Sequence, residues 1–146
     1  MDARGRLRAT GLRVTTPRLA ILRALRQAGP HVTAEAVTLT VRRERPISTQ
    51  AVYDGLAALT KAGLIRRFEP AGHPALYELR VGDDHRHFVC RKCGRIIDME
   101  CAVDVAVCQK ESEAAGFLVQ EIEVTVWGLC EVCHREQNAS AEPTAP

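Results

Sequence analysis

The sequence predicts an α+β protein with two domains and a tail. An N-terminal winged helix-turn-helix occupies residues 1–80, and a small α/β dimerisation domain with a four-cysteine zinc site occupies residues 81–137. Three observations predict this: three helical patterns that precede a two-strand pattern, a change in the sign of the charge along the chain, and two distant C-x-x-C pairs. Residues 138–146 consist mostly of small and polar residues and predict a disordered tail.

The charge of the chain is divided between its two parts. Residues 1–80 carry 14 Lys and Arg against 6 Asp and Glu, whereas residues 81–146 carry 6 against 12, although the net charge is only +2. We therefore expect the first part to face a polyanion such as a nucleic acid. A basic surface that is merely solvated would have the same composition.

The composition excludes several classes of protein. Hydrophobic residues make up 46% of the chain, which argues against global disorder. No segment approaches the ~20 apolar residues of a membrane helix, and residues 1–6 lack the apolar stretch of a secretory signal. We therefore expect a cytoplasmic protein without a membrane partner. In that compartment the six cysteines indicate metal ligands or redox thiols rather than disulfides.

Three predicted helices of the first part have residues at their ends that start or stop helices. Thr and Ser side chains cap free amides, Pro loses no hydrogen bond at the first helical position, and Gly fits the turn after the last residue. The starts are Thr16-Pro17, Thr33, and Ser48 or Thr49; the ends are Gly29-Pro30, Pro46 and Gly63. The apolar stripes are Leu19, Ile21, Leu22 and Leu25; Ala36, Val37 and Val41; and Val52, Leu56 and Leu59.

Two strands, 64–68 and 75–79, follow these helices and complete the order of a winged helix-turn-helix. Its third helix would enter the major groove of DNA, and its hairpin would flank the backbone. On that helix Gln50 can bind an adenine edge, Ala57 can contact a thymine methyl and Tyr53 can bind phosphate.

The predicted DNA contacts are Arg13, Arg18, Thr49, Gln50 and Tyr53. Arg13 and Arg18 are placed to hold phosphates. Asp54 fits poorly among phosphates unless it accepts from a cytosine amine or pairs with a nearby Arg. An exposed helix must carry some polar residues in any case, so these assignments compete with a solvated face.

The strongest local signal is a pair of cysteine motifs. Cys90 and Cys93 form one C-x-x-C pair, and Cys130 and Cys133 form the other. Two such pairs complete a tetrahedral zinc site. Redox-active pairs or an iron–sulfur cluster are the alternatives, but redox motifs usually come singly at the start of a helix, and each pair here follows a predicted strand. We therefore expect structural zinc.

Between the cysteine pairs the pattern predicts a strand at 95–100, a helix at 103–115 and a long strand at 117–127. The strands would expose an edge to which a second copy of the chain could pair, which indicates a homodimer. Cys101 and Cys108 remain: they are either small buried residues or take part in a secondary redox role.

A second group of metal-binding residues precedes the first cysteine pair. His85 and His87 alternate and would point to one side of a strand, with oxygen ligands nearby in Asp83, Asp84, Glu78 and Asp98. Mixed nitrogen and oxygen ligation suits Fe²⁺, Mn²⁺, Co²⁺, Ni²⁺ or Zn²⁺. A solvated polar loop is the alternative.

The order of these motifs is specific from about Leu12 to Cys133. They are Leu12-Arg13-Val14-Thr15-Thr16-Pro17-Arg18, His31-Val32-Thr33-Ala34, Ala51-Val52-Tyr53, Ala62-Gly63-Leu64, Asp84-His85-Arg86-His87, Cys90-x-x-Cys93-Gly94, Asp98 and Gly128-x-Cys130-x-x-Cys133. The chain resembles the ferric uptake regulator family, and within it the actinobacterial, peroxide-responsive branch often encoded beside catalase-peroxidase genes.

This resemblance implies a non-enzymatic, metal-dependent repressor that binds palindromic operator DNA as a homodimer. It assigns the structural zinc to Cys90, Cys93, Cys130 and Cys133, and a regulatory Fe²⁺ or Mn²⁺, which Zn²⁺ could replace in vitro, to His31, Glu78, His85, His87 and Asp98. A metal that spans both domains would fix their relative orientation.

In this family, Asp at the position of Asp98 is associated with peroxide sensing, in which bound iron oxidises a histidine, here His31 or His85. The alternatives are an iron- or zinc-responsive repressor and, from another class, a thiol–disulfide redox protein. Two departures from the family pattern are notable. Asp54 stands where many members have Arg, and Arg86 and Ile122 replace histidines of a further metal site, which we expect to be absent or altered.

Overall fold

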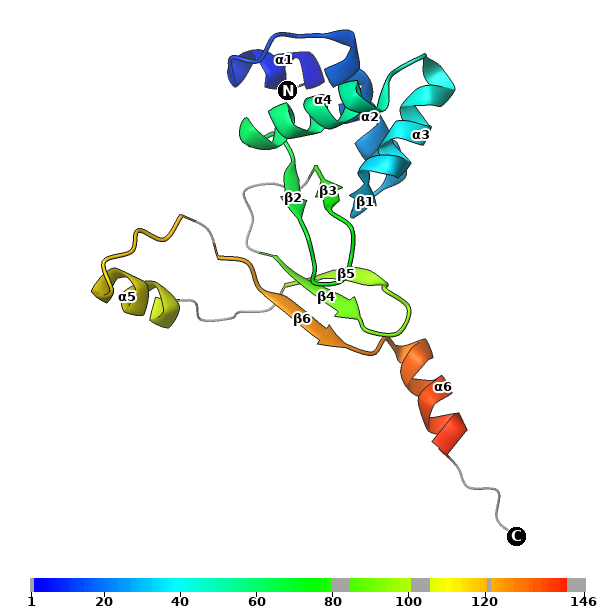
Figure 1. The fold of residues 1–146 in the computed structure, drawn as a ribbon, viewed down its shortest axis with the longest axis vertical. Helices are drawn as coiled ribbons and strands as arrows, with labels where there is room; N and C mark the ends of the chain where they lie inside the picture. The colour runs from blue at the N-terminus through cyan, green and yellow to red at the C-terminus, as the bar shows by residue number, and fades with distance from the viewer. Residues whose placement is uncertain (1, 80–84, 101–105, 121, 142–146) are drawn as a thin grey trace. The chain divides into compact units, whose positions relative to one another are not determined.

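The computed structural model describes residues 2–79, 85–100, 106–120 and 122–141. The chain divides into two compact units, Met1–Asp83 and Asp84–Pro146, which we call the N-terminal and C-terminal units. Figure 1 shows helices together with a small sheet in each unit. Among the described residues, no helix has the length and apolar character needed to cross a membrane.

Four helices build most of the N-terminal unit: α1 (Ala3–Ala9), α2 (Thr16–Ala28), α3 (Ala34–Glu44) and α4 (Thr49–Lys61) (Figure 1). The last three confirm the predicted helices. Thr33 Oγ1 and Ser48 Oγ accept from the backbone amides of Ala36 and Ala51, so two of the predicted caps are present. The predicted cap at Thr16 was wrong, because the residue before α2 is Thr15 and its side chain forms no capping hydrogen bond.

The apolar stripes of α2, α3 and α4 meet in one core. Its central side chains are at most 2% exposed: Ile21, Leu25, Val37, Val41, Val52, Leu56 and Leu59. Gly55 permits a close approach between α2 and α4, because a Cβ atom added there would lie 2.3 Å from Cδ1 of Ile21. This packing holds α4 firmly by its inner face.

A small antiparallel sheet completes the N-terminal unit. It consists of β1 (Val32–Thr33), β2 (Arg66–Phe68) and β3 (Leu76–Glu78), in the order β1-β3-β2. The hairpin of β2 and β3 confirms the wing that the sequence predicted, with shorter strands. β1 was not predicted, because two residues carry no periodic pattern. The helices and the wing together form a winged helix-turn-helix.

The C-terminal unit contains a second sheet of three strands, β4 (Arg86–Cys90), β5 (Ile96–Met99) and β6 (Thr125–Gly128), in the order β5-β4-β6. β4 pairs with β5 antiparallel and with β6 parallel. The unit also contains two helices, α5 (Ala106–Ala114) and α6 (Glu131–Ala141). The predicted strand at 95–100 and helix at 103–115 are therefore found, the latter from Ala106; residues 101–105 lie outside the described part of the chain.

Two predictions for this unit were wrong. The strand at 117–127 is confined to Thr125–Gly128, because β4 offers pairing partners only over residues 87–90. Upstream of β6, Phe117 and Leu118 are 71% and 84% exposed. Residues 138–141, predicted to belong to a disordered tail, are helical instead, because α6 continues through Ala141 in a stretch that contains no Gly or Pro. Residues 142–146 lie outside the described range.

The Ser48 cap should stabilise the N-terminal unit measurably. We expect Ser48→Ala to lower the free energy of unfolding by about 1 kcal/mol, because the amide of Ala51 loses its acceptor. Ser48→Asp should retain most of the stability, since Asp also caps helices well. Urea unfolding followed by circular dichroism measures the difference, and equal midpoints for Ser48→Ala and the wild type would contradict the assignment.

Candidate metal centres and nucleic-acid interface

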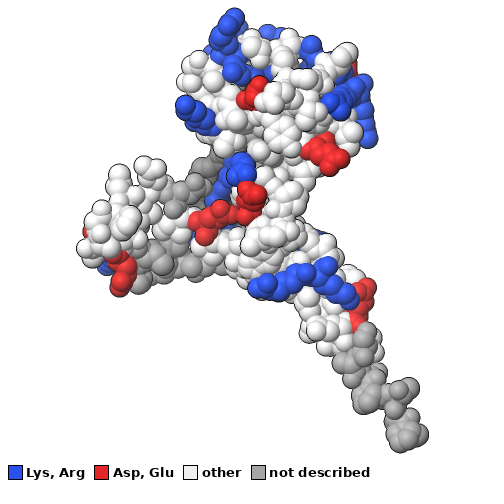
Figure 2. Space-filling model, in the orientation of Figure 1, with Lys and Arg blue, Asp and Glu red and all other residues white. Residues whose placement is uncertain are grey.

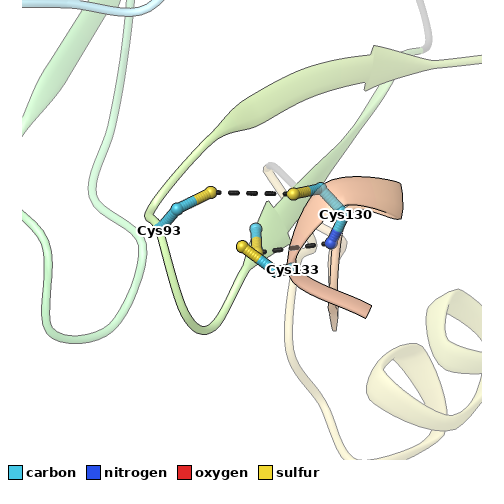
Figure 3. Close-up of side chains that lie close together, drawn as sticks. Cys93, Cys130 and Cys133 are labelled. Carbon is cyan, nitrogen blue, oxygen red and sulfur yellow. Dashed lines mark hydrogen bonds between the residues drawn. The ribbon is translucent and has the colours of Figure 1, made fainter. Parts of the chain in front are cut away.

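Four cysteine sulfurs meet in the C-terminal unit, and Figure 3 labels three of the residues, Cys93, Cys130 and Cys133. The ligand atoms of Cys90, Cys93, Cys130 and Cys133 lie within 4.8 Å of one another, and the Sγ atoms of Cys93 and Cys130 are 3.7 Å apart. None of these four cysteines forms a disulfide. Tetrahedral zinc with bonds of about 2.3 Å to sulfur separates its ligands by roughly 3.8 Å. The spacing of the sulfurs therefore fits a zinc ion.

The parallel pairing of β4 and β6 brings the two cysteine motifs together. Cys90 at the end of β4 is in register with Gly128 at the end of β6, and the amide of Arg91 donates to the carbonyl of Gly128 at 2.8 Å. Cys130 follows two residues later, and its amide donates to Sγ of Cys90 at 3.3 Å. One strand pair thus positions ligands that are 40 residues apart in the sequence.

Backbone donors favour thiolates in this cluster. Amides of Cys93 and Cys130 lower the pKa of the Cys90 thiol to about 6, and the amide of Cys133 lowers the pKa of Cys130. Burial acts in the opposite direction on Cys133 and raises its pKa to about 12. Thiolates crowded into a partly buried site need a cation to neutralise them.

A histidine and a carboxylate come together within the N-terminal unit. β1 and β3 pair Val32 with Tyr77, and the next step of this register sets His31 opposite Glu78. His31 Nε2 and Glu78 Oε2 are 3.4 Å apart, and their side chains are 7% and 2% exposed. His31 has a φ of 58°, an uncommon left-handed conformation that His tolerates better than most residues. Its ring meets the buried Phe68 edge to face.

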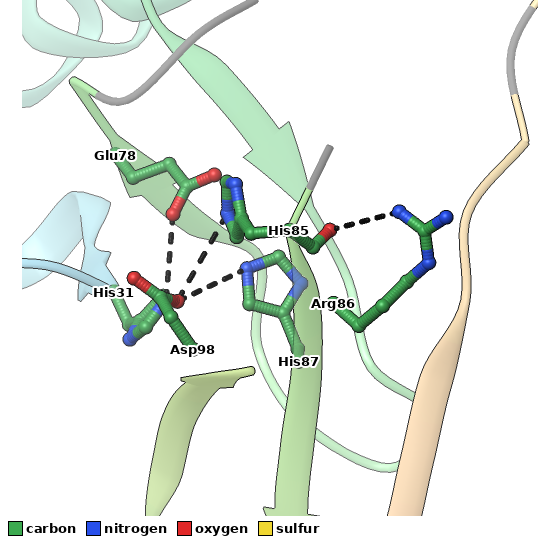
Figure 4. Close-up of polar contacts among 6 residues, drawn as sticks. All are labelled: His31, Glu78, His85, Arg86, His87 and Asp98. Carbon is green, nitrogen blue, oxygen red and sulfur yellow. Dashed lines mark hydrogen bonds and ion pairs between the residues drawn. The ribbon is translucent and has the colours of Figure 1, made fainter. Parts of the chain in front are cut away.

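A similar arrangement occurs within the C-terminal unit. β4 and β5 pair His87 directly with Asp98. Oδ1 of Asp98 lies 3.7 Å from Nε2 of His87 and 3.9 Å from Nε2 of His85. Both imidazoles are buried, and their rings meet edge to face with centroids 4.9 Å apart, so the predicted alternation toward one side is observed. Figure 4 draws these side chains and the His31–Glu78 pair.

The donor sets of both pairs suit a transition metal. The nitrogen–oxygen distances of 3.4, 3.7 and 3.9 Å exceed the 2.7–3.2 Å of an ordinary N–H···O hydrogen bond. Atoms that share one ion through bonds of about 2.1 Å lie roughly 3.0–3.4 Å apart, so slight closing would satisfy a metal. Imidazole and carboxylate ligands accept Fe²⁺, Mn²⁺ or Zn²⁺. Of the other predicted oxygen ligands, Asp83 and Asp84 lie outside the described residues.

Helix α4 presents a polar face to solvent. Thr49, Gln50, Tyr53, Asp54 and Ala57 are exposed, whereas Val52, Leu56 and Leu59 are buried. Lys and Arg side chains are spread over the N-terminal unit in Figure 2. Of the two predicted phosphate contacts, Arg13 is exposed, and its carbonyl accepts from Nη1 of the half-buried Arg18 at 2.8 Å.

Sequence reasoning missed one residue at this surface. Arg42 at the end of α3 donates through Nη2 to Thr49 Oγ1 at 3.0 Å and through Nε to the carbonyl of Ile47 at 3.2 Å. These bonds tie α3 to the first turn of α4. Basic residues in the last turn of a helix were the available signal, but they indicated only a favourable helix end.

Comparison with known proteins identifies the family. The family model of the ferric uptake regulator family matches residues 9–127. The transcriptional regulator FurA of Mycobacterium tuberculosis is 48% identical over 143 residues, which is 97% of each chain. The chain belongs to the ferric uptake regulator family. Members of this family are metal-responsive transcriptional regulators. This chain is therefore such a regulator and not an enzyme.

Two solved structures of this family match the fold. The ferric uptake regulator of Francisella tularensis, determined with iron, has a TM-score of 0.70 and 25% identity, and covers 85% of this chain and 96% of its own. The peroxide stress regulator of Campylobacter jejuni has a TM-score of 0.65 and 26% identity, with 91% and 100% covered. These matches confirm the predicted fold class.

Removal of one sulfur should unfold the C-terminal unit. We expect Cys93→Ser to lose bound zinc and the cooperative thermal transition of that unit together, because three thiolates hold zinc far more weakly than four. Cys101→Ser, which keeps Cys90, Cys93, Cys130 and Cys133, is the matched control and should keep one zinc per chain. Metal analysis by mass spectrometry and calorimetry measure both effects; a normal zinc content and transition in Cys93→Ser would refute the site.

Proposed function

We propose that the protein is a metal-dependent transcriptional repressor in the cytoplasm that binds palindromic operator DNA as a homodimer. The observation that carries the proposal is a buried histidine beside a carboxylate in each of the two units: His31 with Glu78, and His85 and His87 with Asp98. One cation held by both groups would couple the DNA-binding unit to the rest of the chain.

In this proposal His31 and Glu78 hold the regulatory ion from the N-terminal unit, while His85, His87 and Asp98 hold it from the C-terminal unit. A bound Fe²⁺ or Mn²⁺ would supply the positive charge that both carboxylates require. The ion would be fully coordinated only when both units contribute ligands. Metal binding would therefore favour one orientation of the two units over the others. In a dimer that orientation would set the spacing of the two α4 helices, which must match successive half-sites on DNA.

The second unit would supply the dimer and its stability. Cys90, Cys93, Cys130 and Cys133 would hold structural zinc, whose binding stabilises the fold. Phe117 and Leu118 precede β6 and are largely exposed, and they offer apolar surface that a second copy would cover. In the first unit Arg13, Arg18, Thr49, Gln50 and Tyr53 would contact DNA.

We further propose that the signal is peroxide and that the regulatory metal in the cell is iron. Asp98 supports this through the resemblance to peroxide-responsive members, and a peroxide stress regulator is among the structural matches. Bound iron would catalyse the net transfer of one oxygen atom from hydrogen peroxide to His31 or His85, with water as the other product. The oxidised histidine would bind metal less well, and the protein would then release the operator. An iron- or zinc-responsive repressor is the alternative within the same family.

The histidine pairs can be tested through DNA binding. We expect His31→Ala and His85→Ala each to weaken binding of operator DNA at saturating Mn²⁺ by at least about tenfold, since the coupling between sites in regulated proteins is commonly of this size. Structural zinc should remain. His134→Ala, on the exposed face of α6, is the matched control and should bind as the wild type does. Fluorescence anisotropy measures the affinity; unchanged affinity in both zinc-loaded variants would overturn the proposal.

The peroxide signal has its own test. Fe²⁺-loaded protein treated with hydrogen peroxide should release operator DNA, and peptides that contain His31 or His85 should gain the mass of one oxygen atom. Mn²⁺-loaded protein should do neither, because Mn²⁺ does not reduce peroxide in this way. Peptide mass spectrometry makes the comparison. Unmodified histidines in the iron form would leave a metal-responsive repressor and exclude peroxide sensing by this route.

A further inference from the structure

The exposed face of α4 carries a hydrogen-bonded pair with consequences for DNA sequence recognition. Nε2 of Gln50 donates to Oδ1 of Asp54 at 2.8 Å, and both side chains are exposed. The residues are one turn apart, so the bond forms along the helix surface. Within the described part of the chain, no Lys or Arg forms an ion pair with Asp54.

The bond orients the amide of Gln50. It uses one of the two N–H groups on Nε2 and leaves the other N–H and Oε1 available. These two groups are what an adenine edge requires, because adenine offers the N7 acceptor and the N6 amine in the major groove. Asp54 therefore leaves Gln50 able to bind adenine. It also holds the Gln50 amide in the orientation in which Nε2, and not Oε1, faces the carboxylate.

The carboxylate oxygen of Asp54 that does not bind Gln50 would favour base edges that donate hydrogen bonds. A carboxylate only accepts hydrogen bonds. In the major groove, cytosine offers only the N4 donor, whereas adenine has the N7 acceptor beside its N6 donor, and guanine N7 and O6 and thymine O4 are acceptors that would repel Asp54. A negative charge on this face also weakens the attraction to phosphates for every sequence. The negative charge of Asp54 would therefore act through specificity, because it disfavours bases that present acceptors in the major groove.

We propose that Asp54 is a specificity-determining residue: the Gln50–Asp54 pair recognises an adenine and a nearby cytosine, and Asp54 rejects guanine and thymine at its own position. Residues four apart are separated by about 6 Å along the helix, and base pairs by about 3.4 Å, so the two bases lie roughly one or two steps apart. The inference rests on the proposed function, since it requires α4 to enter the major groove.

Selection from a randomised DNA duplex library tests the inference with the full-length, Mn²⁺-loaded protein. The wild type should enrich cytosine near an adenine. Asp54→Ala and Asp54→Asn should lose discrimination at the cytosine by roughly fivefold to a hundredfold, the range that base contacts supply. Asp54→Ala should also weaken the adenine preference, because the Gln50 amide can then rotate, and Gln50→Ala should abolish it.

A matched control separates charge from base recognition. Glu44→Gln removes one negative charge from the same unit, where Glu44 pairs with Arg23. It should leave the base preferences unchanged. If the Asp54 variants likewise keep every base preference, the inference is overturned while the proposed function stands. If the Mn²⁺-loaded wild type enriches no sequence, the proposed function fails, and this inference fails with it.

Discussion

The described residues of the C-terminal unit form almost no apolar core, so this unit depends on another source of stability. The hydrophobic side chains that its described residues bury are Val89, Cys90 and Cys133, and the others it buries are His85, Arg86 and His87. The cluster of apolar side chains lies in the N-terminal unit. Burial of apolar surface is the main favourable term in folding, so the C-terminal unit must be stabilised by other means. Four sulfurs in one place meet that requirement, because metal binding then contributes directly to the free energy of folding.

The two histidine–carboxylate pairs arise from the same structural device, an antiparallel register that sets an imidazole opposite an acid. β1 and β3 bring His31 to Glu78, and β4 and β5 bring His87 to Asp98. A slip of one residue in either register would turn the histidine to the other face of its sheet. Register therefore determines ligand geometry. In the N-terminal unit the hydrophobic packing that fixes the register, including the burial of Phe68, Leu76 and Tyr77, also maintains the His31–Glu78 pair.

Rigidity would allow α4 to discriminate between bases in the way we propose. Ser48 caps its first turn, Arg42 ties that turn to α3, and Gly55 lets it pack closely against Ile21. The outward side chains thus project from a helix with little freedom to adjust. If α4 enters the major groove as proposed, a single charged residue such as Asp54 would affect base preference, because the helix could not move away from a mismatched base at low cost.

The sequence by itself determined the features that depend on neighbours within a few residues. Helices α2, α3 and α4, the wing, the alternation of His85 and His87, and the cysteine pairs all follow from local spacing and capping residues. Tertiary structure alone decided which distant segments pair: the parallel alignment of β4 with β6, the approach of His31 to Glu78, and the restriction of β6 to Thr125–Gly128. The reason is that a helix satisfies its backbone hydrogen bonds internally, whereas a strand exists only where a partner, remote in sequence, supplies them.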